Sequence, residues 1–587
     1  MKSLSLGLVS LGVQQKDRVA LMMNTQGNWA ISDLAILSAG AVNVPIYPTN
    51  KGQQIAHIIN DAGAEIIIVG SLSILNEIMD VWDEMPKLKV VVMPDGTKSK
   101  AKTEGLADEQ KVLEMQEVMA LGQKLAEREP KLYEERWQSV EKGDLASVLY
   151  TSGTTGNPKG VMLTHDNFLS NVRGGLERVP VYDWYTSLSA LPLSHVLERT
   201  AGYYMPLLVG CTIAYAEDIN KLPANLTEVR PHFMVSVPRV YEKAYGRILE
   251  NVNSSSGLKK KIFYWAKGMS KEYAHLFAEG KKPTGFFACK YKLADKLVLK
   301  KISDRFGGRL AFCISGGAPL GKELAEFFNG VQLPTLEGYG LTETSPIISF
   351  NSFDAIRYGS VGKVIAGGEV KIAEDGEILS KGPQNCLGYF NNPEATAELF
   401  DGEWLKTGDI GYLDKDGFLF ITDRKKDLIV TSAGKNIAPQ PLEGILAADR
   451  YISQAVIQGD KRNFIVAMLV PNMEVLEQYA ADKGLAYKSK AELLDLPQIR
   501  EFYALRVAKI LKDRPRFEQV KRIVLKEEEF TLDAKELTPT LKVRRRFIFD
   551  KYRDAFEAIY EGRGGFIEIE YGREAQPQPT ATKSKNI

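Results

Sequence analysis

The sequence predicts an α/β fold, in which a large doubly wound α/β domain with a small β-rich subdomain precedes a smaller α+β domain. Three observations lead to this prediction. Short apolar runs alternate with helical segments up to about Ile314, which is typical of parallel sheets covered by helices on both faces. Glycines cluster and strands shorten after Gly359, and helical segments return after Asp427. A chain of 587 residues has room for two to four domains of about 150 residues each.

The large domain is expected to begin with strands and helices in strict alternation. Its expected strands are 19–23, 42–46, 65–69, 89–93, 212–216, 233–237 and 309–314. Between the first four of them, helices are expected at 29–39, 52–62 and 72–82. The stretch 98–142 is highly charged but carries Leu and Met at helical spacing, so it is interpreted as a helical excursion with a solvated face.

The later part of the chain carries a different pattern. Turn signals at 374–376 and 415–417 predict antiparallel hairpins in the β-rich subdomain. The small domain is expected to contain strands at 455–458 and 464–470 and helices at 473–482 and 499–512. The expected boundaries are 1–424 for the large domain (β-rich part about 351–424), 425–572 for the small domain, and 573–587 for a disordered tail.

Charge and composition exclude several classes of function. With 75 Lys and Arg against 74 Asp and Glu, the net charge of +1 provides no overall attraction for nucleic acid. Four widely spaced cysteines fit neither a metal site nor a disulfide scaffold, which favours a reducing compartment and a cytoplasmic protein. The five histidines form no zinc motif, no apolar run reaches about 18 residues, and the first residues lack a signal-peptide cleavage pattern.

The strongest chemical signal is the segment Tyr150-Thr-Ser-Gly-Thr-Thr-Gly-Asn-Pro-Lys-Gly160, which follows an apolar run. Its glycines let the backbone approach a ligand closely, and its hydroxyls and Lys159 supply the donors and the charge that a polyphosphate needs. The spacing is not that of a Walker A loop. A flexible surface loop is the alternative, but such a loop seldom follows a buried strand.

This segment resembles the phosphate loop of the adenylate-forming superfamily, which includes acyl-CoA synthetases, luciferases and peptide-synthetase adenylation domains. Further segments resemble the other motifs of that superfamily, in the same order. They are Ser315–Pro319, Tyr339–Thr344, Thr407–Gly411, Asp423-Arg424 and Leu537–Lys542. Their joint occurrence over residues 150–545 makes chance a poor explanation. The sequence is most similar in wording to the AMP-forming long-chain fatty-acid–CoA ligases.

The resemblance implies a function for each of these segments. Catalytic roles fall on Lys542, Glu343, Thr154, Lys159 and His195, with Glu343 and Thr154 as ligands of Mg²⁺. Nucleotide binding is implied for Thr151, Ser152, Gly153, Thr154, Thr155, Gly156, Lys159, Gly316, Gly317, Ala318, Glu337, Gly338, Tyr339, Gly340, Thr342, Asp409 and Arg424. The acyl pocket would hold His195 and Tyr241, the hinge would be Lys426, and the coenzyme A tunnel would pass Ala433, Gly434 and Lys435.

The implied reaction is the ATP-dependent activation of a fatty acid to an acyl-adenylate with release of pyrophosphate, followed by transfer to coenzyme A. The partners are thus the fatty acid, ATP and coenzyme A, with Mg²⁺ as cofactor. In the family, the small domain is mobile and rotates between one arrangement for each half-reaction. Family members usually have residues before the segment that begins here at Met1, so the N-terminus is interpreted as shortened.

The assigned residues have physical reasons and simpler alternatives. Glu343 offers a hard oxygen for Mg²⁺, and the ammonium of Lys542 would stabilise charge that builds up on the α-phosphate. The alternatives are a helix-end charge for Glu343 and core packing for Tyr339 and Tyr241. Lys542 also opens the basic stretch 542–546, whose arginines could instead meet coenzyme A or an acidic membrane.

Several functional alternatives stay open at this point. The acyl-adenylate could pass to a carrier protein, or the acid could be aromatic. A catalytically silent nucleotide- or lipid-binding protein is a third reading. The sequence motifs around His195 and at 438–441 resemble those of long-chain ligases, which favours long acyl chains. Peripheral contact with the inner membrane face and a homodimer are also left open.

Overall fold

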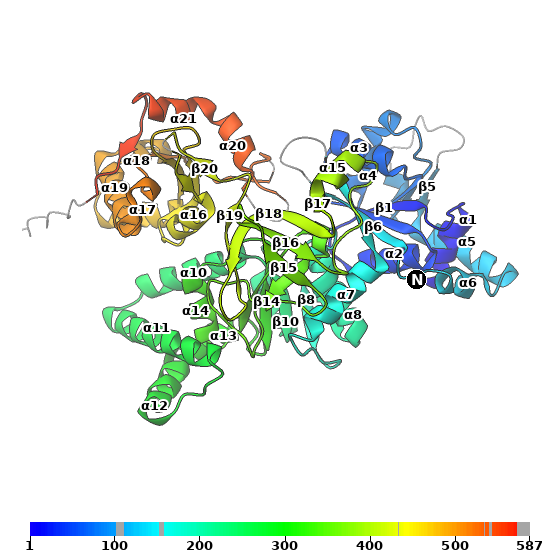
Figure 1. The fold of residues 1–587 in the computed structure, drawn as a ribbon, viewed down its shortest axis with the longest axis horizontal. Coiled ribbons are helices and arrows are strands. Elements are labelled where there is room, and N and C mark those ends of the chain that lie inside the picture. Colours follow the sequence, from blue (N-terminus) through cyan, green and yellow to red (C-terminus); the bar gives the residue numbers. More distant parts are fainter. Residues whose placement is uncertain (101–110, 152–157, 433, 533, 539–542, 572–587) are drawn as a thin grey trace, which may run out of the picture. The chain divides into compact units, whose positions relative to one another are not determined.

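The structure is a computed structural model that describes residues 1–100, 111–151, 158–432, 434–532, 534–538 and 543–571 (Figure 1). Contacts within the chain divide it into two compact units, Met1–Ile421 and Thr422–Ile587. Each unit is described by itself below. The expected tail at 573–587 lies outside the described residues.

The first unit opens with a seven-stranded sheet in which only the last strand is antiparallel to its neighbour. In spatial order its strands are β5 (Lys111–Glu114), β4 (Val90–Met93), β3 (Ile66–Val69), β1 (Arg18–Met22), β2 (Val42–Ile46), β6 (Leu145–Thr151) and β7 (Lys159–Thr164). The inner strand β3 reads Ile-Ile-Ile-Val and is buried throughout, as expected for a strand covered on both faces.

Helices cover both faces of this sheet. On one face lie α3 (Gly52–Ala62) and α4 (Leu72–Met79), and on the other α1 (Lys2–Ser10), α2 (Gly27–Ser38) and α5 (Met115–Arg128). The predicted strands and helices up to Met93 are confirmed, with ends that differ by at most three residues. The doubly wound arrangement is therefore present in this half of the unit.

The interpretation of 98–142 as a solvated excursion was wrong in part. Strand β5 extends the first sheet, and α5 buries Met115 and Val118 against it. Helix α1 crosses α5 so closely that a Cβ on Gly122 would lie 1.8 Å from the Ser3 carbonyl oxygen. The many charges of this stretch hid the apolar stripe that docks α5.

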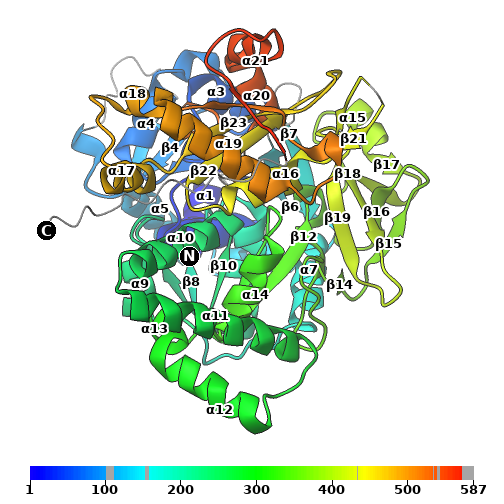
Figure 2. The same ribbon diagram turned by 90° about the vertical axis from the view of Figure 1, so that its left-hand side faces the viewer.

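A second seven-stranded sheet forms the other half of the first unit (Figures 1 and 2). In spatial order its strands are β14 (Lys363–Val364), β13 (Ile347–Phe350), β12 (Thr335–Gly340), β11 (Phe312–Ser315), β10 (Phe233–Ser236), β8 (Thr186–Ser189) and β9 (Thr212–Tyr215). The five strands from β12 to β9 are parallel, and β13 is antiparallel to both of its neighbours, β12 and β14.

Helices again cover both faces of the second sheet. One face packs against α9 (Leu222–Val229), α10 (Pro238–Asn253), α11 (Gly257–Ala278), α12 (Gly285–Ala294), α13 (Lys300–Asp304) and α14 (Lys322–Gly330). The other face packs against a π-helical segment, Glu198–Tyr204. The remaining helices of the unit are α6 (Leu132–Gln138), α7 (His165–Leu176), α8 (Met205–Val209) and α15 (Pro393–Leu399).

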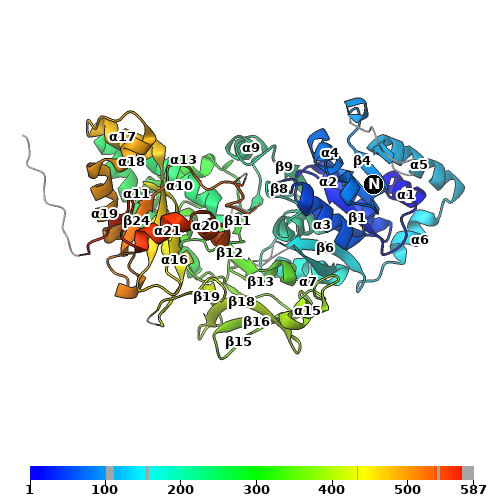
Figure 3. The ribbon, with the colours of Figure 1, turned by 90° about the horizontal axis from the view of Figure 1, so that it is seen from above.

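The β-rich part of the first unit consists of antiparallel hairpins (Figure 3). Its strands are β15 (Glu369–Ile372), β16 (Glu377–Lys381), β18 (Trp404–Leu413), β17 (Phe400–Asp401) and β19 (Leu419–Arg424), the last of which continues past Ile421 into the second unit. Both predicted hairpin turns are confirmed, and Gly376 and Gly417 adopt φ of +85° and +81° within them. Glycine is favoured there because other residues rarely adopt a positive φ.

The second unit has an α+β fold. Its main sheet contains β22 (Ile452–Gln458), β23 (Val466–Pro471), β24 (Arg522–Leu525) and β25 (Ile567–Glu568), and β20 (Ile429–Val430) pairs with β21 (Asn436–Ile437). Its helices are α16 (Pro439–Ala447), α17 (Met473–Asp482), α18 (Lys490–Asp495), α19 (Pro497–Leu511), α20 (Arg545–Lys551) and α21 (Arg553–Tyr560). Alternate residues of β23 enter two different cores, so both faces of the sheet are covered.

Among the described residues of both units, no helix is long and apolar enough to cross a membrane.

Candidate active site

The segment that resembles a phosphate loop joins two antiparallel strands of the first sheet. β6 ends at Thr151, β7 begins at Lys159, and these two residues are partners in the ladder. Residues 152–157 lie outside the described residues; they include Ser152, Gly153, Thr154, Thr155 and Gly156. The ladder therefore fixes both ends of the loop close together.

Lys159 and Glu343 are brought together through Tyr389. The Nζ atom of Lys159 lies 5.1 Å from the centroid of the Tyr389 ring, and the Tyr389 hydroxyl donates to Glu343 Oε1 at 2.8 Å. Glu343 and Thr342 belong to a short 3₁₀ turn, Thr342–Thr344, directly after β12. Burial, and then the nearby Glu343 carboxylate, raise the pKa of Tyr389, so it remains a hydroxyl donor.

Tyr339 and Asp409 form a second pair from distant segments. The Tyr339 hydroxyl donates to Asp409 Oδ2 at 2.8 Å, and both residues are buried. Asp409 stands in β18 just after Gly408, whose φ of +71° and backbone N–H bond to Glu377 hold the strand bend. The adenine and ribose candidates thus lie at one place in the first unit.

Glycines keep the ends of β11 and β12 free of side chains. A Cβ on Gly340 would lie 1.5 Å from the Pro346 carbonyl oxygen, and one on Gly338 would lie 3.2 Å from Phe350 Cβ. Gly316, Gly317 and Ala318 follow the end of β11, and Gly317 adopts φ of +83°. These strand ends are the carboxyl edge of the parallel sheet, where ligands of open α/β sheets bind.

Glu337 lies in β12, opposite Ser315 of β11. Its carboxylate accepts the backbone N–H of Leu320 at 2.8 Å. Burial raises the pKa of Glu337 to about 8, against the opposing effect of that hydrogen bond. At neutral pH this residue is therefore mostly a protonated acid that can donate as well as accept.

His195 lies in the turn between β8 and the π-helical segment. Its Nδ1 accepts the backbone N–H of Leu197 at 3.1 Å, so the proton of the neutral ring is on Nε2. The side chain of Leu197 is also what a Cβ on Gly316 would meet, at 3.2 Å. The His195 turn therefore packs against the strand end that carries Gly316 and Gly317.

Tyr241 of α10 is buried within the core of the second sheet. Its side chain is 3% exposed and its ring packs edge-on against Phe328 at 5.2 Å. Burial, and then the neighbouring Cys313, raise the pKa of Tyr241 well above its usual value. The structure thus places Tyr241 on the helical side of the sheet, among core residues.

The remaining candidates belong to the second unit. Arg424 ends β19, and its backbone N–H donates to Asp423 Oδ1 at 2.6 Å. Lys426 is exposed in the turn that follows. Gly434 (φ +71°) and Lys435 lie in the β20–β21 connection, while Ala433 and Lys542 are outside the described residues.

The basic stretch after Lys542 needs a correction. Arg545 is buried and donates to both carboxylate oxygens of Glu443, with Nη2–Oε2 at 2.7 Å. A guanidinium that is engaged in this way cannot also bind coenzyme A or a membrane. The interpretation of the stretch as an anion-binding patch is therefore wrong for Arg545.

The burial of two acidic side chains carried no sequence signal. Glu198 is completely buried at the start of the π-helical segment, and a Cβ on Gly202 would lie 2.4 Å from its Oε1. Burial raises the pKa of Glu198 to about 8, partly offset by the Ser189 hydroxyl. Asp423 is buried as well, and burial raises its pKa to about 7. Neither residue could be distinguished from a surface acid by pattern alone.

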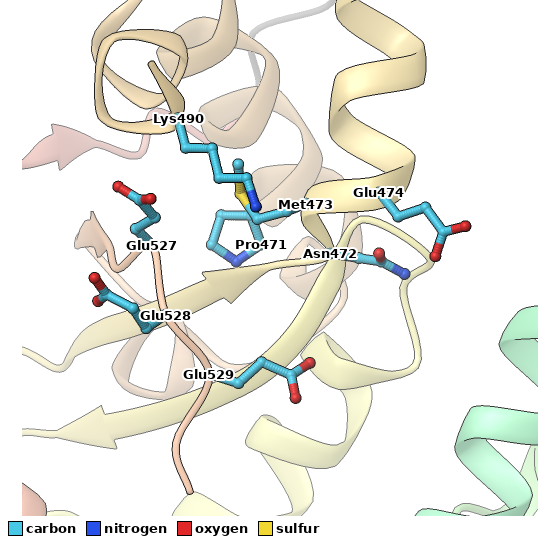
Figure 4. Close-up of a pocket in the computed structure, with 8 residues that line it drawn as sticks. All are labelled: Pro471, Asn472, Met473, Glu474, Lys490, Glu527, Glu528 and Glu529. Atoms are coloured by element: carbon cyan, nitrogen blue, oxygen red, sulfur yellow. The ribbon is translucent and has the colours of Figure 1, made fainter. Parts of the chain in front are cut away.

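A pocket of about 370 Å³ lies in the second unit, and none of the residues that the motifs single out lines it (Figure 4). It is lined by Pro471, Asn472, Met473, Glu474, Lys490, Glu527, Glu528 and Glu529. Its glutamates do not converge: no group of three His, Cys, Asp or Glu among the described residues could hold a metal ion.

Comparison with family models covers both units. A model described as AMP-binding enzyme matches residues 1–390, and one described as AMP-binding enzyme C-terminal domain matches residues 426–564. Together these two matches take in most of the chain.

Individual relatives agree with the family models. The chain is 35% identical to the long-chain-fatty-acid–CoA ligase FadD15 of Mycobacterium tuberculosis, over 95% of this chain and 90% of that protein. It is 31% identical to the peroxisomal long chain acyl-CoA synthetase 7 of Arabidopsis thaliana, over 94% and 79%. The adenylation domain of a carboxylate reductase from Mycobacterium chelonae shares the fold, with a TM-score of 0.73, 20% identity, and coverage of 95% and 83%.

Proposed function

This chain belongs to the AMP-binding enzyme family, and we propose that it is an AMP-forming ligase that joins a long-chain fatty acid to coenzyme A. The first half-reaction is attack of the fatty-acid carboxylate on the α-phosphate of ATP, which releases pyrophosphate and leaves an acyl-adenylate. In the second, the thiol of coenzyme A takes the acyl group and AMP leaves. The relatives named as long-chain ligases support the choice of acid.

One observation carries the assignment to this chain's own residues: the Lys159–Tyr389–Glu343 contact. It joins the exit of the phosphate loop to a carboxylate, which is the pairing that a magnesium-bound triphosphate requires. Lys159 supplies positive charge to the phosphates. Glu343, with Thr154 in the loop, would hold Mg²⁺, which takes one or two protein carboxylates and otherwise phosphate oxygens and water.

The nucleoside end of ATP would lie at the Tyr339–Asp409 pair. Asp409 would accept hydrogen bonds from the ribose hydroxyls, and Arg424 would donate to the same sugar. Tyr339 would present its ring to adenine beside Gly316, Gly317 and Ala318. A mostly protonated Glu337 suits this place, since it adds no charge that would repel the phosphates.

The acid would be held by the turn that carries His195. Because Nδ1 accepts from Leu197, the ring carries its proton on Nε2, and this N–H would donate to the fatty-acid carboxylate. We assign Tyr241 to the wall of the acyl pocket, whose lining would be the apolar residues packed around it.

The second unit supplies the groups that change between the two half-reactions. Lys542 would stabilise the α-phosphate while the adenylate forms, Lys426 would act as the hinge, and Ala433, Gly434 and Lys435 would line the path of the pantetheine arm. Support comes from the bridge between Leu537 and Val543, which ties together both ends of the segment that includes Lys542. We also propose a cytoplasmic location, a peripheral membrane contact and a homodimer.

The proposal is tested by pyrophosphate release from ATP and Mg²⁺ with fatty acids from four to eighteen carbons, with and without coenzyme A. We expect steady release that requires coenzyme A and increases with chain length. A single burst that coenzyme A does not change would mean that the acyl group passes to another acceptor. Release only with aromatic acids would overturn the choice of substrate.

A further inference from the structure

The helices α11, α12 and α13 carry a concentrated positive charge. Residues 257–304 contain twelve Lys, no Arg and four Asp or Glu, a net charge of +8, whereas the whole chain has +1. The rest of the chain is therefore acidic overall. In Figures 1 and 2, α12 projects at the outer edge of the helical layer that covers the second sheet.

Large apolar side chains stand in water among these lysines. Phe286 is 75% exposed, Leu293 51% and Leu297 41%. They lie on one uninterrupted helical segment, Gly285–Asp304, at spacings of seven and four residues that return to the same side. We call Phe286, Leu293, Leu297 and the exposed lysines between them, Lys290, Lys292 and Lys296, the basic helical face.

The other side of the same segment is fully docked. Tyr291, Ala294 and Leu299 are buried in the core that also contains Phe263 of α11 and Tyr241 of α10. Phe286 and Leu293 therefore do not belong to this core; they form a separate apolar surface. Exposed apolar residues grouped in this way usually mark a binding surface.

We propose that the basic helical face docks on the surface of an anionic lipid bilayer. Lysines near an acidic bilayer are attracted to its surface potential, and aromatic and leucine side chains enter the boundary between head groups and acyl chains. Both components are present on one face here. Either component alone gives weak binding, and their combination is what a peripheral membrane contact requires.

Other occupants fit the face less well. A second copy of the chain that docked through the same face would bring two surfaces of net charge +8 together, and these repel each other. Nucleic acid would satisfy the lysines but leave Phe286, Leu293 and Leu297 in contact with water. A bilayer is the partner that satisfies both kinds of side chain.

The docking would have a consequence for substrate supply, and this step alone rests on the proposed function. Long-chain fatty acids reside in membranes. The core behind the basic helical face is continuous with the residues around Tyr241, so a docked enzyme would face the lipid with the helical layer that encloses the proposed acyl pocket.

Vesicle co-sedimentation of the full chain, without ATP or fatty acid, tests the docking. We compare vesicles of phosphatidylcholine with vesicles that contain about 30% phosphatidylglycerol, at low and high salt. The chain should bind the anionic vesicles, and less so at high salt. The variant Lys290→Glu/Lys292→Glu/Lys296→Glu should partition at least about 100-fold more weakly.

A matched charge control is Lys87→Glu/Lys124→Glu/Lys131→Glu, which alters three exposed lysines of the first-sheet half of the same unit. This control has the same net charge as the triple variant. Its lysines lie outside the basic helical face, so it should lose far less binding. Equal loss in both variants would refute the basic helical face as the docking site. Failure of the unmodified chain to bind anionic vesicles at low salt would refute docking itself.

The apolar component is tested by Phe286→Ser/Leu293→Ser, which should weaken partition by about tenfold. Leu208→Ser, at a residue that is 52% exposed on α8, is the control and should bind like the unmodified chain. If the double variant binds vesicles unchanged, or if the chain binds a short DNA duplex but not vesicles, the partner is not a bilayer. Because no substrate is present, these outcomes are independent of the ligase reaction.

Discussion

Each unit of the chain contains one buried arginine–carboxylate pair among its described residues, and the two pairs differ in what surrounds them. In the first unit, Arg199 donates to Asp33 at 2.5 Å, and both side chains are completely buried. Asn43 and Tyr204 also donate to Asp33, while Ser147 accepts from Arg199. This network joins α2 and two strands of the first sheet to the π-helical segment that packs on the second sheet.

In the second unit, Arg545 forms a two-pronged pair with Glu443. Glu443 also accepts the backbone N–H of Ile457 at 2.7 Å, which ties α16 to β22. Arg545 is the first residue of α20, three positions after Lys542. This pair therefore anchors the C-terminal end of the segment that contains Lys542, to which we assign transition-state stabilisation.

The comparison indicates that a buried arginine–carboxylate pair can either stabilise a fold or position a catalytic group. Arg199 bonds to several elements of one unit, so its removal should lower the free energy of unfolding. Arg545 lies between the core of the second unit and the segment that contains Lys542, so a change at Arg545 should slow one half-reaction. The predictions that follow test this contrast.

The largest effect is expected for Arg199→Met. Removal of the guanidinium leaves Asp33 buried without its cationic partner, which costs about 3–5 kcal/mol of unfolding free energy. The measurement is a urea unfolding curve. The double variant Arg199→Met/Asp33→Leu should recover part of the loss, because no uncompensated charge remains. If Arg199→Met alone unfolds like the unmodified protein, the network does not join the two halves of the unit.

Lys542→Ala should affect chemistry and leave stability unchanged. We expect adenylation to slow by about 10²–10³-fold, the scale for one preorganised transition-state contact. Thioester formation from supplied acyl-adenylate should be largely unaffected, and single-turnover assays measure the two steps separately. Equal loss in both steps would rule out a role confined to adenylation.

Arg545→Lys should resemble a milder form of that variant. Lysine keeps the charge beside Glu443 but not the two-pronged geometry, so the segment before it should be held less firmly. We expect about a tenfold loss in adenylation with little change in thioester formation. A purely structural role would predict equal losses in both steps together with a lower melting temperature.

Glu198→Gln sharpens the comparison inside the first unit. Glu198 is a buried acid that directly precedes Arg199 in the sequence, but Arg199 pairs with Asp33. Its pKa is raised from about 4.5 to about 8 in the folded protein. The unfolded chain loses this proton at lower pH, so the stability of the unmodified protein falls as pH rises between those values. Glutamine cannot ionise and should escape this loss.

The expected result is nearly equal urea midpoints near pH 5 and a more stable glutamine variant near pH 8, by about 3–4 kcal/mol. The substituted side chain would also need room beside Gly202, so near-equal stability at pH 5 serves as the packing control. A difference that does not change with pH would mean that Glu198 is ionised in the fold and paired.

The sequence was sufficient for those parts of the fold that local patterns determine. β3 and β4 are runs of Ile and Val, and β1 and β2 are mostly apolar; the four strands alternate with α2, α3 and α4, as expected for strands that are covered on both faces. The hairpin at Gly376 required a residue that tolerates a positive φ. Helix was expected in the stretch that contains α5, but its docking on the sheet was missed because its buried stripe is narrow and its exposed residues are mostly charged.

The contacts within the candidate site were beyond local patterns. Tyr389 has no distinguishing neighbours in the sequence, yet it connects Lys159 to Glu343. Arg199 and Asp33 also lie far apart along the chain, separated by 166 residues. Motifs name residues that ligands need, whereas the residues that orient them are found only when segments approach in space.

Glu343→Gln tests a carboxylate unlike those of the two buried pairs. Glu343 is held by the neutral hydroxyl of Tyr389, so its charge is not consumed by an arginine and is available to a cation. Glutamine retains an oxygen that accepts from Tyr389 but lacks that charge. We expect the Mg²⁺ concentration for half-maximal adenylation to rise by about tenfold with stability unchanged. Tyr389→Phe, which keeps the charge and loses the hydrogen bond, should shift it less. An unchanged magnesium titration in Glu343→Gln would leave Glu343 as only a charge in a 3₁₀ turn.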